Sequence, residues 1–216
     1  SSYVYSDLDF IFLGKIVETI SGKRLDEYVY ENFYHPLHMS RTGFNPTKNH
    51  SLSNIVPTEM DSFFRQQHIR GYVHDEAAAI LGGVAGHAGL FSSAEDLGIL
   101  FQMLLNGGIY KKKRYLKAET IQYFTSYQSL KSRRGLGFDK PEKNNSQLKV
   151  PYPALSGSEE MYGHTGFTGT CVWVEPRENL IFIFLTNRVN PTRNNGLLFT
   201  LNVRSALLES ALKYSE

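Results

Sequence analysis

The sequence predicts an α+β domain in which helices pack on an antiparallel sheet. Apolar residues recur at helical spacing over 8–20, near the start of the chain. Two β-rich runs, Thr170–Glu175 and Leu180–Thr186, lie near its end, and an amphipathic segment over Asn195–Tyr214 closes it. Helices, then a hairpin, then a closing helix are typical of the α+β class. No internal repeat is visible, so we predict one domain over residues 1–216.

The first predicted helix runs from Leu8 to Ile20, where Phe10, Leu13, Val17 and Ile20 have helical spacing. Ser21-Gly22 stops it, and a second helix, Leu25–Phe33, follows at once. The next residues, His35-Pro36-Leu37-His38, are a poor metal chelator because the proline separates the two rings badly and no carboxylate completes the set.

The middle of the chain predicts two more helices and one strand. Ser92-Ser93-Ala94-Glu95 is typical of a capping box and starts a helix that reaches Leu105. Asn106-Gly107-Gly108 ends that helix, because glycine readily takes the left-handed conformation. A further helix is predicted over Ala118–Tyr127 and a short strand over Gly135–Phe138.

The two β-rich runs near the end predict an antiparallel hairpin, since only Pro176-Arg177-Glu178-Asn179 separates them. Two or three strands rarely hold a domain of this length. We therefore expect partner strands from a segment before Ser1 or from a second chain.

Charge and composition exclude several function classes. The net charge of +2 comes from 23 basic and 21 acidic residues, and the run Lys111–Arg114 beside a Gly-Gly turn predicts a solvated hairpin or loop without the aromatic residues of a nucleic-acid site. The single Cys171 excludes an internal disulfide, and no Cys/His group has zinc spacing. The apolar runs are too short to span a bilayer. We expect no metal, cofactor, nucleic acid or membrane span.

Two short motifs carry the chemistry that the sequence offers. Tyr5-Ser6-Asp7 stands directly before the first helix, where Asp7 is a good N-cap and a tyrosine usually packs. His164-Thr165-Gly166 leads through Phe167 into a strand. There a hydroxyl, an imidazole and a backbone amide together suit a carboxylate or an oxyanion, although a lone histidine on a strand is more often structural.

Together these pieces resemble the serine β-lactamase and penicillin-binding-protein superfamily, particularly its class C-like esterases and D-Ala-D-Ala carboxypeptidases. Tyr5-Ser6-Asp7 matches the Tyr-x-Asn motif, and His164-Thr165-Gly166 matches the Lys-Thr-Gly or His-x-Gly motif. The glycine-rich segment Leu81–Phe91 is similar to the module that follows a family 3 β-N-acetylglucosaminidase domain in some bacterial proteins. The resemblance implies a β-lactamase/transpeptidase-like fold of which this chain is the C-terminal part.

The resemblance also implies a mechanism and a missing part. A serine and a lysine of a Ser-x-x-Lys motif would form the acyl-enzyme, Tyr5 would shuttle the proton, and the Phe167 amide would be half of the oxyanion hole. The only Ser-x-x-Lys match, Ser146-Gln147-Leu148-Lys149, comes after the tyrosine motif in a polar stretch, so we treat it as coincidence. We expect this chain alone to be inactive.

Two departures from the family pattern concern the substrate. His164 replaces a lysine and, with an ordinary pKa of about 6.5, is mostly neutral at pH 7, which weakens carboxylate recognition. Asp7 replaces asparagine and adds a negative charge. Both favour a peptidase, amidase or esterase acting on small-molecule or peptidoglycan-derived substrates over an efficient β-lactamase. The resemblance places the protein in the periplasm or cell envelope.

Other interpretations stay open at this point. The chain is compatible with a non-catalytic peptidoglycan-binding or sensor module that has lost its nucleophile, and with a fragment whose exposed sheet edge pairs with a second copy. His87 either borders the active-site cleft or sits in a tight turn with hydrogen-bond partners. Cys171 and Trp173 are expected in the core.

Overall fold

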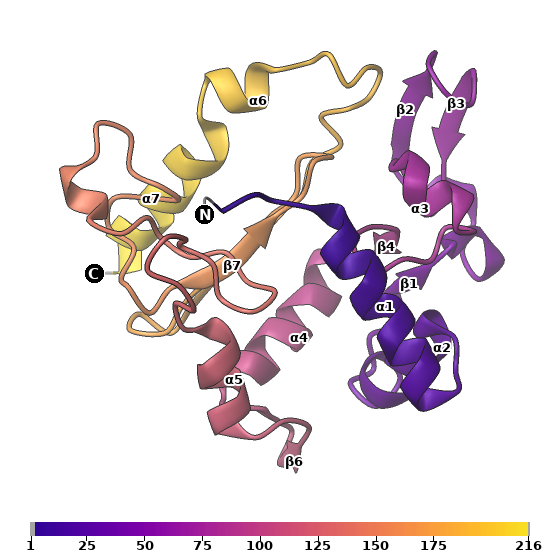
Figure 1. Ribbon diagram of the computed structural model, residues 1–216. Helices are drawn as coiled ribbons and strands as arrows, with labels where there is room; N and C mark the ends of the chain where they lie inside the picture. The colour runs from indigo at the N-terminus through magenta and orange to yellow at the C-terminus, as the bar shows by residue number, and fades with distance from the viewer. Residues whose placement is uncertain (1–2, 216) are drawn as a thin grey trace. The chain divides into compact units, whose positions relative to one another are not determined.

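A three-stranded antiparallel sheet organises the C-terminal part of the chain in the computed structural model, which describes residues 3–215. Its strands are β7 (Tyr162–Thr165), β8 (Cys171–Glu175) and β9 (Leu180–Phe184), with β8 in the centre (Figure 1). All five residues of the central strand are buried, whereas those of β9 are half-buried. The hairpin that the sequence predicts is confirmed.

The hydrophobic core of this part lies between the sheet and the last helix. Trp173, with 2% of its surface exposed, packs there with Met161 and with Leu208 and Leu212 of α7 (Val203–Ser215). Cys171 belongs to the same core, and burial raises the pKa of its thiol to about 11. Trp173 and Cys171 are therefore core residues, as predicted.

The closing helix is interrupted, so the prediction of one helix over Asn195–Tyr214 is wrong in this respect. The structure has a short α6 (Leu197–Thr200), then a break, then α7. At the break Asn202 has a φ of +49°, the left-handed conformation that asparagine tolerates better than most residues. The break sets the first turn of α7, and with it Arg204, beside the β7–β8 turn.

The remaining elements of this part follow the predicted order with two corrections. They are α4 (Ala94–Leu105), the hairpin β5 (Ile109–Tyr110) and β6 (Lys113–Arg114), α5 (Ala118–Thr125) and a short 3-10 turn, Asn145–Gln147. The helix α5 ends two residues before the predicted Tyr127. The basic run turns the hairpin, with Lys111 and Lys112 at positive φ.

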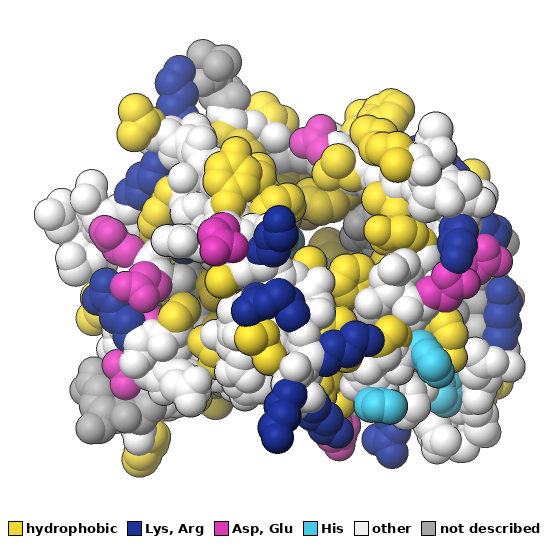
Figure 2. Space-filling view, turned by 90° about the horizontal axis from the view of Figure 1, so that it is seen from below, with side chains coloured by type: hydrophobic (Ala, Val, Ile, Leu, Met, Phe, Trp, Pro, Cys, Tyr) yellow, Lys and Arg dark blue, Asp and Glu magenta, His cyan; other side chains and the backbone are white. Residues whose placement is uncertain are grey.

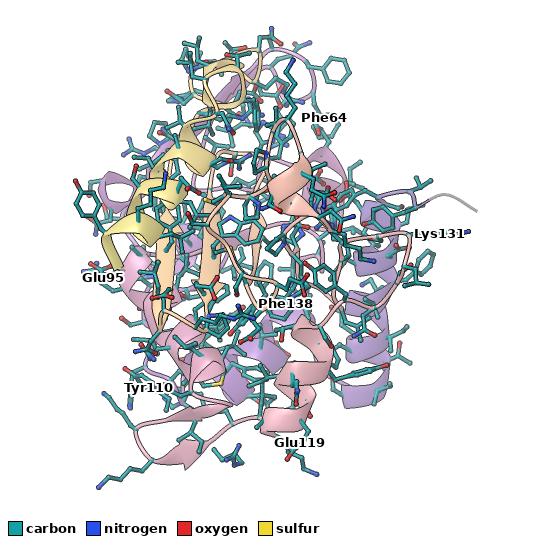
Figure 3. All side chains as sticks on the ribbon, turned by 90° about the vertical axis from the view of Figure 1, so that its left-hand side faces the viewer. Phe64, Glu95, Tyr110, Glu119, Lys131 and Phe138 are labelled. Carbon is teal, nitrogen blue, oxygen red and sulfur yellow. The ribbon has the colours of Figure 1, made fainter. Side chains whose placement is uncertain are left out.

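The second correction is that Gly135–Phe138 is not a strand. Its hydrogen bonds are local or go to a helix end: the Gly135 amide donates to Phe138 O and the Leu136 amide to Phe124 O. Phe138 packs edge-on against Tyr162 at 5.3 Å between ring centroids. In Figure 3 it lies beside the sheet strands, whereas the Lys131 side chain extends away from them.

The chain divides into two compact units. The sheet unit consists mainly of residues 98–186 and 195–215, and the other unit of residues 4–97 and 187–194. The second unit contains α1 (Asp7–Ser21), α2 (Leu25–Val29), the π-helical turn η1 (Tyr30–Tyr34), two 3-10 turns (Pro46–Lys48 and Leu52–Asn54), α3 (Glu76–Ile80), and the strand pairs β1 (Gly43–Phe44) with β4 (Leu90–Phe91) and β2 (Pro57–Asp61) with β3 (Gln67–Arg70).

Glycines let the helix α1 touch the glycine-rich segment backbone to backbone. A Cβ atom on Gly86 would lie 2.1 Å from the carbonyl oxygen of Phe10, and one on Gly14 would lie 3.2 Å from the Gly86 nitrogen. Only residues without side chains permit so close an approach. The glycine-rich sequence therefore has a packing role against α1.

A buried charge cluster connects residues 187–194 with the rest of the second unit. Arg193 donates from Nη2 to Oε2 of Glu59 at 2.7 Å, and His74 Nε2 lies 2.9 Å from the same oxygen. Burial by itself would raise the pKa of Glu59, but the hydrogen bonds from Arg193 outweigh it and lower the pKa. The carboxylate is thus charged and paired at neutral pH.

The apolar side of α1 is largely uncovered within the described residues. Gly14 is the only fully buried residue of the helix, while Leu8, Phe12, Ile16 and Ile20 are at least half exposed. Figure 2 shows hydrophobic side chains interspersed with basic ones on one face of the protein. Among residues 3–215, no helix combines the length and the apolar character needed to cross a membrane.

Candidate active site

The residues proposed from the sequence fall into different units. Tyr5 and Asp7 belong to the unit built on α1, and His164, Thr165, Gly166 and Phe167 belong to the sheet unit. Each group has its own surroundings within its unit.

Tyr5-Ser6-Asp7 leads into α1, but a different residue caps the helix. The N-cap is Ser6, whose Oγ accepts a hydrogen bond from the Leu8 amide at 3.3 Å. Asp7 is the first helical residue and is exposed, so the prediction of Asp7 as the N-cap is wrong. Its carboxylate lies in the first turn, where the helix dipole favours negative charge. Tyr5 is 54% exposed just before the helix.

His164 lies on the edge strand β7 with both ring nitrogens engaged. Its Nε2 is 2.8 Å from Nη1 of Arg134, and its Nδ1 is 2.8 Å from the Thr165 carbonyl oxygen. A guanidinium can only donate, so Nε2 is the acceptor and the ring proton sits on Nδ1, which donates to the carbonyl. The two contacts therefore define one neutral tautomer.

The surroundings of His164 keep the ring neutral. Burial lowers its pKa below the ordinary value, and the positive charge of Arg134 lowers it further. The histidine that replaces the family lysine is thus uncharged at pH 7, as its ordinary pKa led us to expect. The positive charge at this motif belongs to Arg134 instead.

The charge state of His164 can be measured directly. We expect ¹⁵N spectra of the isolated chain at pH 7 to show a neutral ring protonated on Nδ1, titrating below about 6.5. Arg134→Gln removes a neighbouring cation and is expected to raise this pKa, whereas Lys131→Gln, which removes a charge from the same loop, leaves the pKa unchanged. A ring protonated on Nε2 in the parent chain would contradict the assignment.

The lowered pKa of His164 also makes the free energy of unfolding depend on pH. Below about pH 6.5 the unfolded chain binds a proton at this position more readily than the folded chain does. The contribution of His164 to the free energy of unfolding is therefore complete above pH 6.5 and is lost as the pH falls through the folded pKa.

Arg134 belongs to a partly buried charge network. Its Nε lies 3.3 Å from Oδ1 of Asp139, which is almost fully buried and also receives two hydrogen bonds from Arg133. Tyr152 donates its hydroxyl to Oδ2 of Asp139 at 2.8 Å. These contacts hold the guanidinium of Arg134 against the edge strand. Sequence reasoning missed Arg134, whose only local signal is the adjacent pair Arg133-Arg134.

The strand and the turn after it have little room for larger residues. A Cβ on Gly163 would lie 2.1 Å from Val172 O, and one on Gly166 would lie 2.4 Å from Thr170 Oγ1. In the turn, the Gly166 amide donates to Thr170 O at 2.8 Å, and Phe167 exposes 60% of its surface. The motif thus places the Thr165 hydroxyl and a tight backbone turn directly after His164.

His87, in the unit built on α1, pairs with a side chain of the same unit. Its Nε2 lies 2.8 Å from Oδ1 of Asp75, the N-cap of α3, and no described atom pairs with its buried Nδ1. Burial by itself would raise the pKa of Asp75, but the hydrogen bonds from the Ala78 amide and His87 outweigh it and lower the pKa. Within residues 3–215, no three His, Cys, Asp or Glu side chains gather as metal ligands.

Ser146-Gln147-Leu148-Lys149 lies in an exposed loop of the sheet unit. Ser146 is part of the 3-10 turn, and both Ser146 and Lys149 are exposed. The mechanism that the resemblance implies needs a helix to present the serine. The exposed turn does not provide that arrangement.

Comparison with known proteins gives a consistent result. The Beta-lactamase family profile matches residues 1–205. A protein of Escherichia coli K12 with the provisional name D-alanyl-D-alanine carboxypeptidase is 38% identical over 200 residues, which cover 87% of this chain and 45% of that protein. The chain thus spans about half the length of the curated relatives it matches.

Solved structures agree on the fold. A penicillin-binding protein homologue from Caulobacter crescentus matches 97% of this chain and 59% of its own, with a TM-score of 0.62 and 17% identity. A beta-lactamase from Mycobacterium bovis matches 98% of this chain and 65% of its own, with a TM-score of 0.61 and 19% identity. The fold class is therefore the one that the sequence resemblance implies.

Proposed function

Because the chain belongs to the Beta-lactamase family, we propose that it is part of a serine hydrolase domain that cleaves cell-wall peptide, amide or ester bonds through an acyl-enzyme. In this proposal residues 1–216 form the C-terminal part of one domain. Tyr5 transfers the proton, Asp7 stands beside it on α1, and His164-Thr165-Gly166 lines the substrate strand. The Phe167 amide donates one of the two oxyanion hydrogen bonds.

The observation that carries the choice of substrate is the Arg134–His164 contact at 2.8 Å. A neutral histidine in place of lysine would leave the motif without a positive charge. Arg134 supplies a permanent one at the same strand, and a guanidinium is well suited to bind a carboxylate. This favours substrates that end in a free carboxylate, such as D-alanyl-D-alanine peptides, over neutral esters.

The nucleophile in this proposal is a Ser-x-x-Lys serine outside the 216 residues. In support, the chain covers only 45% of its Escherichia coli relative, and the one internal match is the exposed loop at Ser146. We further propose that a strand from the rest of the protein, or from a second copy, pairs with the outer edge of β9, to which no strand within residues 3–215 is hydrogen-bonded. A periplasmic or cell-envelope location fits this activity.

Labelling with a fluorophosphonate or a fluorescent penicillin, followed by intact-mass measurement, tests the proposal. We expect a longer form of the protein that includes Ser-x-x-Lys to gain one adduct on that serine, and the present chain to gain none. Ser146→Ala in the longer form is the matched control and should label like the parent. Labelling of the present chain that Ser146→Ala abolishes would refute the assignment, and a natural protein without any Ser-x-x-Lys would point to the peptidoglycan-binding module.

A further inference from the structure

The turn between β7 and β8 carries the amide proposed as an oxyanion donor. The Gly169 amide donates to Gly166 O at 3.1 Å inside the turn, and Thr186 Oγ1 donates to Gly169 O at 3.1 Å from the end of β9. Gly169 has a φ of +117°, which only glycine adopts easily. The far end of the turn is therefore also held by the segment that follows β9.

An arginine from the last helix contacts both ends of the turn. Arg204, in the first turn of α7, donates from Nη1 to Thr170 O at 3.2 Å and to Gly166 O at 3.4 Å. The contacts are long, but the donor is charged, and charged hydrogen bonds are stronger than neutral ones. Its guanidinium also lies over the Phe199 ring, 5.2 Å from the centroid.

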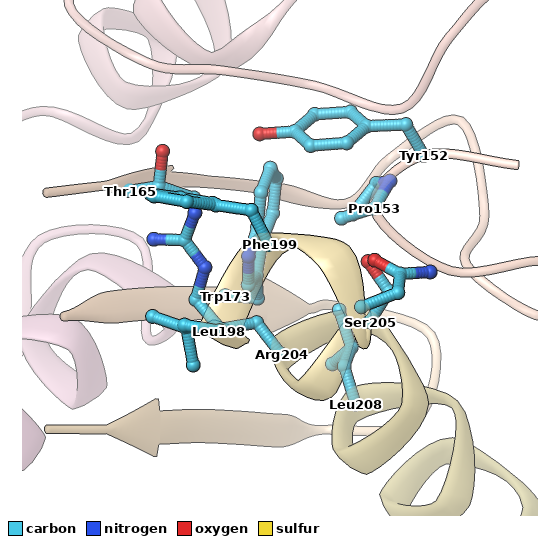
Figure 4. A pocket seen from close by; sticks show the side chains of 10 residues that line it. Tyr152, Pro153, Thr165, Trp173, Leu198, Phe199, Arg204, Ser205 and Leu208 are labelled. Carbon is cyan, nitrogen blue, oxygen red and sulfur yellow. The ribbon is translucent and has the colours of Figure 1, made fainter. Parts of the chain in front are cut away.

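Arg204 reaches the turn along the wall of a small pocket. The pocket has a volume of about 160 Å³ and is lined by the sheet residues Thr165 and Trp173 and by the helix residues Phe199, Arg204 and Ser205, among others. Figure 4 shows the Arg204 side chain extending from the helix toward the end of β7, where Thr165 lies. The arginine thus contacts the turn from its inner side.

The geometry of one peptide unit connects Arg204 with the Phe167 amide. The carbonyl of Gly166 and the N–H of Phe167 belong to the same planar trans peptide, so they point to opposite sides. Drawing the carbonyl toward Arg204 therefore turns the N–H away from the helix. A cation on the carbonyl oxygen also polarises the amide and makes its N–H a stronger donor.

We propose that Arg204 is a positioning residue for the Phe167 amide in the oxyanion hole. The inference rests on the proposed acyl-transfer function, and it adds the group on α7 that orients the donor. Arg204 touches neither substrate nor reacting atoms in this proposal; it acts through the Gly166–Phe167 peptide.

The first test uses the present chain and needs no activity. In ¹⁵N–¹H spectra, Arg204→Met should shift the amide signal of Phe167, because the cation that orients and polarises the Gly166–Phe167 peptide is gone. Arg204→Lys should give a smaller change, and Ser205→Ala, from the same pocket wall, should leave the signal in place. An unchanged Phe167 signal in Arg204→Met would overturn the proposal, even if the acyl-transfer function held.

The second test uses the longer form of the protein that carries Ser-x-x-Lys. Arg204→Met should lower kcat by about 10-fold with little change in KM, because loss of a whole oxyanion donor costs about 100-fold or more and here the donor is only misdirected. Arg204→Lys should recover part of the rate, and Ser205→Ala should keep all of it. A change in KM alone, or no recovery with lysine, would overturn the proposal. Absence of acylation in the parent protein would refute the proposed function while the spectroscopic test still decides the role of Arg204.

Discussion

Arg134→Gln, in a form of the protein that carries Ser-x-x-Lys, is expected to lower kcat/KM for peptides ending in a free carboxylate by about 100-fold. Arg134 brings a permanent cation to the strand that carries His164, whose ring is neutral. Hydrogen bonds to a charged group contribute about 1.5–3 kcal/mol, and the upper part of this range corresponds to about 100-fold in binding. Steady-state kinetics on an N-acylated D-alanyl-D-alanine peptide measure the loss.

Substrate chemistry provides the internal control for this prediction. A neutral p-nitrophenyl ester has no carboxylate to lose, so its kcat/KM should fall by less than about 3-fold in Arg134→Gln. Lys131→Gln removes a positive charge from the same loop and should leave both substrates unaffected. If the ester and the peptide lost rate equally, Arg134 would be supporting the fold of the site and not recognising the carboxylate.

Gly86→Ala is expected to destabilise the unit built on α1 by about 3 kcal/mol or more, at the upper end of what overpacking costs. The new methyl group would lie 2.1 Å from the Phe10 carbonyl oxygen, and that atom belongs to a helix backbone which cannot turn aside like a flexible side chain. Relief requires α1 to move away from the glycine-rich segment. Urea unfolding followed by circular dichroism measures the change.

Gly43→Ala is the matched control, because no atom lies within 4 Å of a Cβ at Gly43, in a strand of the same unit. Its effect should stay within about 0.5 kcal/mol, as for an ordinary surface substitution. Equal stability of Gly86→Ala and Gly43→Ala would show that α1 and the glycine-rich segment do not depend on their close approach. Because Tyr5 directly precedes α1, activity of the longer protein should fall together with stability in Gly86→Ala.

Sequence patterns succeeded where the structure depends on neighbouring residues. The first helix, the end of α4 just before Asn106-Gly107-Gly108 and the hairpin around Pro176 follow from helical spacing, glycine conformation and β-rich runs. All of these act over a few residues. The buried Trp173 follows in the same way from its place in an apolar strand. The family motifs are equally local, and they indicate the fold class without any tertiary contact.

The same patterns failed at three places along the chain. Gly135–Phe138 has strand-like composition, but its backbone bonds to Phe124 and to itself, and the closing helix breaks at Asn202 although its periodicity continues. The predicted capping box begins one residue too early, at Ser92, whereas Ser93 caps the helix. Ser93 accepts from the Asp96 amide, while the Asp96 carboxylate binds the Arg41 amide and the Thr42 hydroxyl.

The sequence by itself determined the family and the α+β class, and it predicts the motif residues, including His164 in place of the family lysine. It did so because each motif is a short run whose residue types carry the chemistry. Only the tertiary structure decided which charges meet that motif: Arg134, thirty positions before His164, and Arg204, thirty-seven positions after Phe167. Hydrogen bonds depend on distances in space, and separations of that length in the chain predict none of them.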